Sequence, residues 1–179
     1  MFTMRPATGG DVSGVAAMIR ARCDWMEERG IPSWRESVED LAGQAARGAM
    51  WVLGDGGGRT VGCTTVLPRA PARDWTAAEA AEPSLYLFST ATDPAYREYG
   101  PGALIALWAV DRAARSGRCW VRRGCYAPAL ARYYERQGFT LVRQESREEL
   151  RLYLLARRAE PLDLDVLGIV RDCAGLREH

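Results

Sequence analysis

The chain has 179 residues, of which 47% are apolar and 26% are charged. This length fits one ordinary domain with a hydrophobic core, so no disulfide or metal staple is needed. The 24 basic and 23 acidic residues leave a formal net charge of +1. A protein that binds nucleic acid through overall positive charge would carry a larger basic excess, so we expect no nucleic-acid partner.

Two residue types are missing or nearly so, and this excludes several kinds of catalysis. Every basic residue is arginine, so lysine nucleophiles and Schiff bases are excluded. The single histidine is His179, at the end of the chain, which argues against a Ser-His-Asp triad and a histidine metal site. The five cysteines form no Cys-x-x-Cys pair and are odd in number. We therefore expect buried thiols in a reducing compartment and no metal.

The sequence carries no signal for export or membrane insertion. Its first residues lack the basic-then-apolar pattern of a signal peptide. Its best apolar stretch is far shorter than the roughly 18 to 20 residues that span a bilayer. We expect a cytoplasmic protein without a membrane partner.

The first half of the chain alternates between strand and helix patterns. Apolar spacing and glycine stops predict a strand at 2–6, a helix at 12–29, a second helix at 37–48 and a hairpin at 49–55 and 59–67. Residues 68–83, which contain three prolines, read as a long connection. Such loops are usually functional lids or mobile segments.

The second half continues the alternation. It predicts strands at 84–94, 118–124, 139–145 and 150–158 and helices at 103–117, 128–138 and 161–176. The last helix would cap the fold or, alternatively, form a contact in a homodimer. The whole order implies a mixed α/β sheet with helices on both faces.

The strongest local motif is Arg97-Glu98-Tyr99-Gly100-Pro101-Gly102, between a predicted strand and a predicted helix. Glycines allow a tight turn, and a helix start presents free N–H groups that favour a phosphate. The motif is not a Walker loop, which needs lysine. It also lacks the third glycine of a dinucleotide fingerprint, because Ile105 stands there. A plain turn is the alternative interpretation.

A second motif follows about thirty residues later, where Tyr133 and Tyr134 precede Gly138 and Phe139. A phenol beside a bound cofactor can protonate a departing thiolate, and its ordinary pKa of about 10 suits that task. The alternative is an aromatic helix end that only packs.

Together the two motifs resemble the GCN5-related N-acetyltransferases, the GNAT family. Arg97, Gly100 and Gly102 match its Q/R-x-x-G-x-G/A motif, and Tyr134 begins a match to its Tyr-Glu-x-x-Gly-Phe stretch. The resemblance covers roughly residues 2–158. The segment from Arg29 to Trp34 looks similar to a bacterial branch of the family.

The resemblance implies a fold and a domain plan. The fold would be a mixed, mostly antiparallel central sheet with helices on both faces and a splayed strand pair. Residues 1–158 would form the acetyltransferase domain, and 159–179 a C-terminal helical extension.

The resemblance also implies a reaction. Acetyl-CoA, as co-substrate, would lie where strands 84–93 and 118–124 separate, and the amine of a small molecule would attack its thioester directly. Tyr134 would be the catalytic acid. The implied cofactor-binding residues are Thr90, Ala91, Thr92, Arg97, Glu98, Tyr99, Gly100, Gly102, Ala103 and Tyr133.

This sequence departs from the family pattern at two positions, and its strand 84–93 holds no glutamate to serve as a general base. Pro101 removes one N–H that could face the pyrophosphate, and Ala127 replaces an asparagine found in many relatives. These departures keep open a non-catalytic module of the same fold that binds CoA weakly or not at all. Transfer of another acyl group, or transfer to a hydroxyl, is a third reading.

The general base and the acceptor pocket are less well defined. Asp24, Glu27, Glu28 and a water relay are the candidates for the base. Aromatic residues could bind a cationic amine, and the candidates are Trp34, Tyr86 and Phe88, together with Trp25 and Trp75. Packing in the core or a loop is the alternative for each.

Overall fold

The computed structural model describes residues 1–171, and these form a mixed eight-stranded sheet with helices. The strand order is β6-β7-β5-β4-β3-β2-β1-β8. The strands are β1 (Phe2–Pro6), β2 (Met50–Gly54), β3 (Thr60–Leu67), β4 (Ser84–Thr92), β5 (Trp120–Cys125), β6 (Thr140–Arg147), β7 (Leu150–Arg158) and β8 (Ile169–Arg171).

The helices largely match the sequence expectations. The α-helices are α1 (Val12–Glu27), α2 (Val38–Gly43), α3 (Ala77–Ala81), α4 (Pro101–Arg115) and α5 (Pro128–Arg136). Short 3-10 turns are η1 (Gly9–Asp11), η2 (Arg35–Ser37), η3 (Gln44–Arg47) and η4 (Pro94–Tyr99). The predicted mixed α/β class is confirmed.

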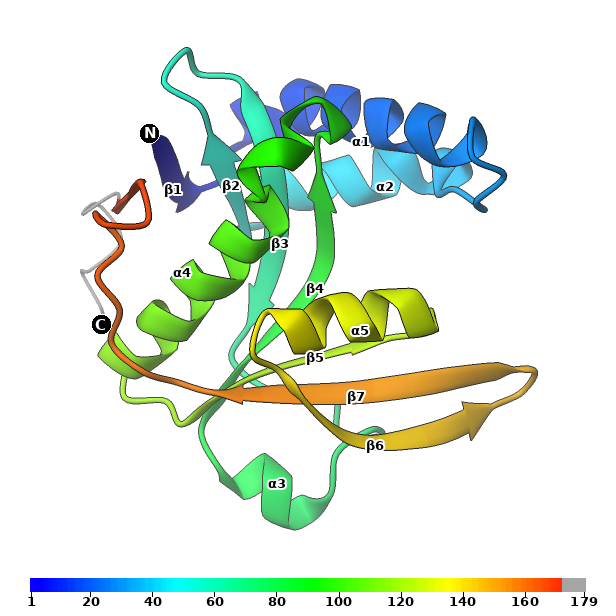
Figure 1. Cartoon of the computed structure of the whole chain (residues 1–179), viewed down its shortest axis with the longest axis vertical. Helices are drawn as coiled ribbons and strands as arrows, with labels where there is room; N and C mark the ends of the chain where they lie inside the picture. Colours follow the sequence, from blue (N-terminus) through cyan, green and yellow to red (C-terminus); the bar gives the residue numbers. More distant parts are fainter. Residues whose placement is uncertain (172–179) are drawn as a thin grey trace. The chain divides into compact units, whose positions relative to one another are not determined.

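The chain divides into two compact units. Unit 1 comprises Met1–Thr65, Ser89–Ile105 and the segment from Asp163 onward. In it β2 pairs antiparallel with both β1 and β3, and α1 and α2 lie side by side (Figure 1). The apolar face of α1, with Ile19 and Cys23 fully buried, packs into a core shared with Met50 of β2.

Unit 2 comprises Val66–Phe88 and Ala106–Leu162. Here β4 runs parallel to β5, and β7 pairs antiparallel with β5 and β6. The recorded β4–β5 pairs end at Leu87 and Arg123, whereas β5 continues to pair with β7 as far as Cys125. Helix α5 packs against β5 and β7 (Figure 1).

The connection at 68–83 is more ordered than its composition suggested. It contains α3, whose start is closed by a capping box between Thr76 and Glu79. Trp75 is only 4% exposed, and the guanidinium carbons of Arg122 and Arg143 lie 4.9 and 5.6 Å from its ring centroid. The segment thus forms part of unit 2 and contains a helix that the sequence analysis did not predict, and its role as a lid stays a prediction.

The prediction of a helix at 161–176 is wrong for residues 161–171, which the structure describes. Residues 161–171 form turns and then β8, which pairs parallel with β1 through Ile169 and Phe2. Gly168 has a φ of 74°, which breaks a helix, and Leu164 and Ile169 are buried. Residues 172–176 of that prediction lie outside the described residues, and the domain boundary at 158 stays a prediction.

Among residues 1–171, no helix has both the length and the apolar character needed to cross a bilayer. The same residues contain no group of three or more His, Cys, Asp or Glu side chains suited to hold a metal ion.

Candidate functional site

In unit 1, a buried aspartate anchors the glycine-rich loop where β4 ends. The Asp93 side chain is 2% exposed and accepts hydrogen bonds from the Ala95 N–H at 2.9 Å and from Arg59 at 2.7 Å. The Asp93 N–H donates to the Val61 carbonyl of β3 at 2.9 Å. The first residue of the loop is therefore fixed to the sheet on one side and caps η4 on the other.

The loop then turns into α4 through a left-handed glycine. Gly100 has φ 60° and ψ 48°, its N–H donates to the Arg97 carbonyl at 3.1 Å, and its own carbonyl accepts from Leu104 at 3.0 Å. Any residue with a Cβ would be strained in this conformation. The tight turn brings the predicted anion loop directly to the first turn of the helix.

The start of α4 offers hydrogen-bond donors. The N–H groups of Gly102 and Ala103 lie in the first turn, where an α-helix provides no internal acceptor. The helix dipole and the exposed Arg97 side chain add positive potential, while Pro101 contributes no N–H. This junction has the donors and the charge to bind a phosphate or pyrophosphate. Glu98 and Tyr99 are exposed on the same turn.

The last residues of β4 are tied to their neighbours by side chains. The hydroxyl groups of Thr90 and Thr64 are 2.8 Å apart. Arg22 of α1 donates from Nε to the Thr92 carbonyl at 2.8 Å and from a terminal nitrogen to the Thr92 hydroxyl at 2.6 Å. Arg22 thus fixes both polar groups of Thr92 at the end of β4. Sequence reasoning did not identify Arg22, because nothing in its local pattern links it to β4.

In unit 2, Tyr134 is a buried residue of α5. Its side chain stacks on the Arg123 guanidinium, whose carbon lies 3.6 Å from the ring centroid, and its ring neighbours those of Tyr133 and Phe139 at 6.1 and 6.2 Å. Burial raises the pKa of Tyr134, while the positive charge of Arg123 acts in the opposite direction. The phenol is therefore held protonated at neutral pH.

The start of α5 is built without a side-chain cap. Ala127 occupies the N-cap position, and its side chain makes no capping hydrogen bond. Its carbonyl accepts from Leu130 and Ala131 at 3.1 Å, and Pro128 provides the first helical residue. The helix start survives the missing asparagine because proline fixes the backbone there.

The predicted acceptor residues fall into both units. Trp34 belongs to unit 1, is 39% exposed and lines a cavity of about 420 Å³ with Glu27 and Arg35. Tyr86 and Phe88 belong to unit 2 and are partly buried, and burial raises the pKa of the Tyr86 phenol. Trp25, another candidate, is partly buried and has the guanidinium groups of Arg22 and Arg29 at 5.1 and 4.1 Å from its ring centroid. Trp75 is a buried residue beside two arginines, which supports the packing alternative for it.

The carboxylates considered as general bases are engaged in ion pairs. Arg35 bonds both Asp24 and Glu27, with 2.9 Å between its Nε and Glu27 Oε1. Hydrogen bonds from Arg35 and then Ser33 lower the pKa of Glu27. A general base at neutral pH needs the opposite shift, so Glu27 is a weaker base than a free glutamate.

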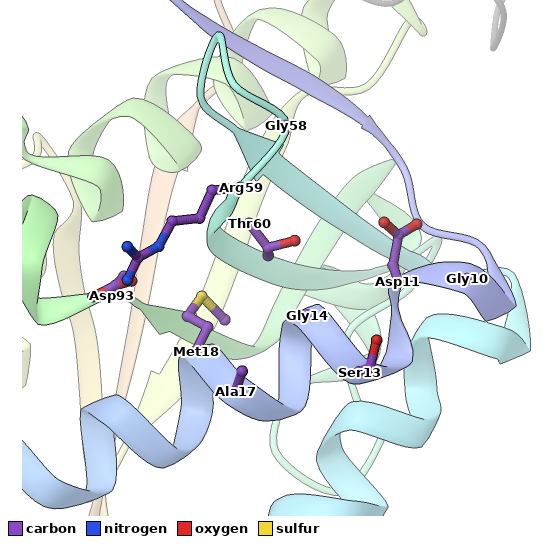
Figure 2. A pocket seen from close by; sticks show the side chains of 10 residues that line it. All are labelled: Gly10, Asp11, Ser13, Gly14, Ala17, Met18, Gly58, Arg59, Thr60 and Asp93. Atoms are coloured by element: carbon purple, nitrogen blue, oxygen red, sulfur yellow. The ribbon is translucent and has the colours of Figure 1, made fainter.

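Figure 2 shows a separate cavity of about 360 Å³ in unit 1, beside the start of α1 and the β2–β3 turn. Its charged groups are already paired. Arg59 reaches Asp93, and Arg5 bonds Asp11 at 2.6 Å, which lowers the Asp11 pKa to about 2. None of the predicted cofactor or acceptor residues lines this cavity.

The chain matches no protein-family model and no curated protein by sequence. Solved structures do match. A GNAT-family acetyltransferase from Listeria monocytogenes superposes with a TM-score of 0.67 and 16% identity, over 88% of this chain and 94% of that chain. The ribosomal-protein-S18-alanine N-acetyltransferase from Escherichia coli superposes with a TM-score of 0.61 and 15% identity, over 91% of this chain and 97% of that chain.

A third match extends the comparison to eukaryotes. A polyamine N-acetyltransferase from Drosophila melanogaster, which forms N-acetylagmatine, gives a TM-score of 0.60 and 14% identity, over 88% of this chain and 100% of that chain. The sequence motifs and these structural neighbours agree: the chain has the fold of the GCN5-related N-acetyltransferases.

Proposed function

We propose that this protein is an acetyl-CoA-dependent N-acetyltransferase acting on the amine of a small molecule. The observation that carries the proposal is the junction of β4, η4 and α4. There a left-handed Gly100 leads from the exposed Arg97 into a helix start with donors at Gly102 and Ala103. Such a junction suits a pyrophosphate, the most highly charged part of a CoA thioester that the loop would meet.

In the proposed reaction, the backbone of the last β4 residues, Thr90 to Thr92, aligns the pantetheine arm. Arg22 fixes the Thr92 carbonyl for this role. The amine attacks the thioester carbonyl carbon directly, without a covalent enzyme intermediate. Positioning and hydrogen-bond donors aimed at the developing oxyanion supply most of the acceleration.

Tyr134 is the proposed general acid. It is protonated at neutral pH because burial raises its pKa. As the C–S bond breaks, the phenol gives its proton to the thiolate of CoA, which prevents the reverse attack. Tyr133, the neighbouring phenol, is assigned to cofactor binding.

The acceptor class is proposed from the neighbours and the aromatic residues. The Drosophila neighbour acetylates a polyamine-like amine, and the Escherichia coli neighbour an alanine amine. Trp34 lines its cavity with Glu36 and with Glu27, which is paired with Arg35; the indole face and the Glu36 carboxylate are the groups that would attract an ammonium group. Small cationic amines are therefore the first substrates to test.

Two observations favour a second candidate, a non-catalytic module of the same fold. Pro101 contributes no donor to the anion loop, and Ala127 leaves α5 without a side-chain cap. Such a module would bind CoA weakly or not at all and would act through protein contacts.

Calorimetric titration with acetyl-CoA separates the two candidates. We expect saturable binding, followed by acetylation of at least one amine in a panel of agmatine, spermidine and an alanine-ended peptide, measured by mass spectrometry. Absence of acetyl-CoA binding would refute the enzyme proposal and support the non-catalytic module. Binding with transfer to an alcohol instead of an amine would correct the acceptor class.

A further inference from the structure

Arg123 of β5 is a buried charged residue that has no role in the reaction proposed above. Arg123 is 2% exposed, and its guanidinium lies 3.6 Å from the Tyr134 ring centroid and 5.5 Å from that of Phe139. Burying a cation is costly unless it interacts with groups that favour the charge. The two aromatic rings offset part of this cost: burial lowers the pKa of Arg123, and Tyr134 acts in the opposite direction.

The preceding residue offers a natural comparison. Arg122 is 3% exposed, and its guanidinium lies 4.9 Å from the ring of Trp75. Successive side chains of a strand point to opposite faces, so Arg122 supports the 68–83 segment while Arg123 faces α5. The two arginines have equal burial and different aromatic partners.

The proposed proton transfer is uphill without help. A thiol has an ordinary pKa near 8.5 and a phenol near 10, so a phenol is the weaker acid of the two. Burial raises the pKa of Tyr134 further and widens this gap. A cation in contact with the ring narrows the gap, because it stabilises the phenolate more than the neutral phenol.

We propose that Arg123 is a positioning residue for acetyl transfer: its guanidinium fixes the Tyr134 ring and stabilises the phenolate left after the proton passes to the CoA thiolate. The inference rests on the proposed function, because it assigns Arg123 a part in the proton transfer that Tyr134 would carry out. Tyr134 touches the reacting atoms, and Arg123 acts through it.

The proposed step transfers one acetyl group and conserves every proton. The amine nitrogen forms a bond to the carbonyl carbon, the C–S bond breaks, and its electron pair stays on sulfur. The sulfur takes the Tyr134 proton, which leaves a phenolate beside the Arg123 cation. The phenolate then recovers a proton from the new amide nitrogen, directly or through solvent. The products are the N-acetyl amine and free CoA thiol.

Other titratable groups lie on the elements around Tyr134. Cys125, also on β5, has its thiol pKa raised to about 11 by burial, so it carries no charge at neutral pH. Tyr133 is a neighbouring phenol of α5. From β7, Arg157 donates to the Gln137 carbonyl at 2.6 Å, beyond the end of the helix. Arg123 is thus the cation that contacts the phenol.

The test uses two variants of the proposed residue, Arg123→Met and Arg123→Lys. Arg122→Met is the matched control. All proteins are labelled with 3-fluorotyrosine, which brings phenol titration into a milder pH range, and Tyr134→Phe assigns the Tyr134 signal in fluorine NMR. We expect Arg123→Met to raise the Tyr134 pKa by about one unit or more, a tenfold weaker acid. Arg123→Lys should give a smaller rise, and Arg122→Met none.

The kinetic arm follows kcat against pH for the same variants. Arg123→Met should lower kcat by roughly tenfold and shift the alkaline limb upward, with partial recovery in Arg123→Lys. An unchanged Tyr134 titration, or a loss of kcat that Arg122→Met reproduces, overturns the proposal. If Arg123→Met does not fold, the lysine variant decides by the same two measurements.

The coupling of Arg123 to Tyr134 and the acetyltransferase activity are tested by separate measurements. The titration uses the free protein and requires no turnover, so a missing shift refutes the Arg123–Tyr134 coupling alone. A normal shift in a protein that neither binds acetyl-CoA nor transfers acetyl refutes the proposed function and, with it, the catalytic part of this inference.

Discussion

Replacing Tyr134 by phenylalanine removes one hydroxyl and keeps the ring that Arg123 and Phe139 contact. Loss of the hydroxyl should change the free energy of unfolding by only about 1 kcal/mol. General acid catalysis contributes about 10²- to 10⁴-fold, which corresponds to about 2.7 to 5.4 kcal/mol of activation free energy. We therefore expect a large fall in kcat with little change in thermal stability.

The pH dependence has a defined sign. Burial disfavours the phenolate and raises the pKa of Tyr134, so its acid form is present through neutral and mildly alkaline pH. Its contribution is full below that raised pKa and is lost above it. The wild-type protein should lose activity on the alkaline side as Tyr134 ionises, and Tyr134→Phe should lack this limb.

The assay is single-turnover formation of the acetylated amine, measured beside calorimetric binding of acetyl-CoA. Binding should hardly change, because the hydroxyl acts when the thiolate leaves. Tyr133→Phe is the matched control on the same helix. Unchanged single-turnover rates in Tyr134→Phe would refute the assignment, and an equal loss in Tyr133→Phe alone would move the role to that residue.

Three further predictions follow from the same geometry. Gly102→Val should weaken acetyl-CoA binding in calorimetry, because the new side chain would stand in the first turn of α4, where the pyrophosphate is proposed to bind. Gly43→Val in α2 is the control and should bind acetyl-CoA normally. Equal binding by both variants would place the cofactor elsewhere. Gly138→Ala should lower the melting temperature by the equivalent of about 1 to 2 kcal/mol, because φ is +85° and the new Cβ would lie 3.1 Å from Arg157; an unchanged melting temperature would contradict this. Hydrogen bonds from Arg143 lower the pKa of Glu79 from 4.5 to about 2, so its stabilisation of α3 is full above about pH 4.5 and fades towards pH 2. The protection factors of the α3 amides, which compare the measured exchange with the intrinsic exchange at each pH, should fall in that window; Glu79→Gln should show the lower protection already at neutral pH, and equal protection in both proteins would contradict this.

Much of the fold follows from local patterns. Glycines with positive φ end the elements where we predicted them, at Gly30, Gly48 and Gly138. The helix predicted at 12–29 is confirmed as α1, and its apolar spacing places Ile19 and Cys23 on one buried face. Such signals depend only on residues close in sequence, which is why they transfer reliably to the structure.

The errors arose where a distant partner decides the conformation. The 161–176 segment has helical spacing, but its residues from Ile169 onward to Arg171 form β8, which pairs with the edge of β1. The 68–83 segment contains a readable capping box, Thr76 to Glu79, yet its order also depends on Arg143 from β6. Periodicity in one segment cannot predict such tertiary partners.

The candidate site divides in the same way. The motifs identified Gly100 and Tyr134 because each motif lies within one short stretch. Arg22 and Arg123 were missed, since their importance comes from contacts with Thr92 and Tyr134 that no spacing rule encodes. The acceptor residues were proposed from aromatic character alone, and this criterion does not distinguish exposed Trp34 from buried Trp75.

The side-chain ties of β4 have a mechanical consequence. Arg22 of α1 donates two hydrogen bonds to Thr92, and the Gln44 side chain is hydrogen-bonded to both Ser89 of β4 and Thr65 of β3. A shift of α1 or of the turn after α2 is thereby transmitted to the two ends of the 89–92 segment. A ligand that binds against α1 and α2 would therefore also change the position of the Thr92 carbonyl. Binding of that ligand and binding of a second ligand at Thr92 would then be coupled, each changing the affinity for the other by the same factor.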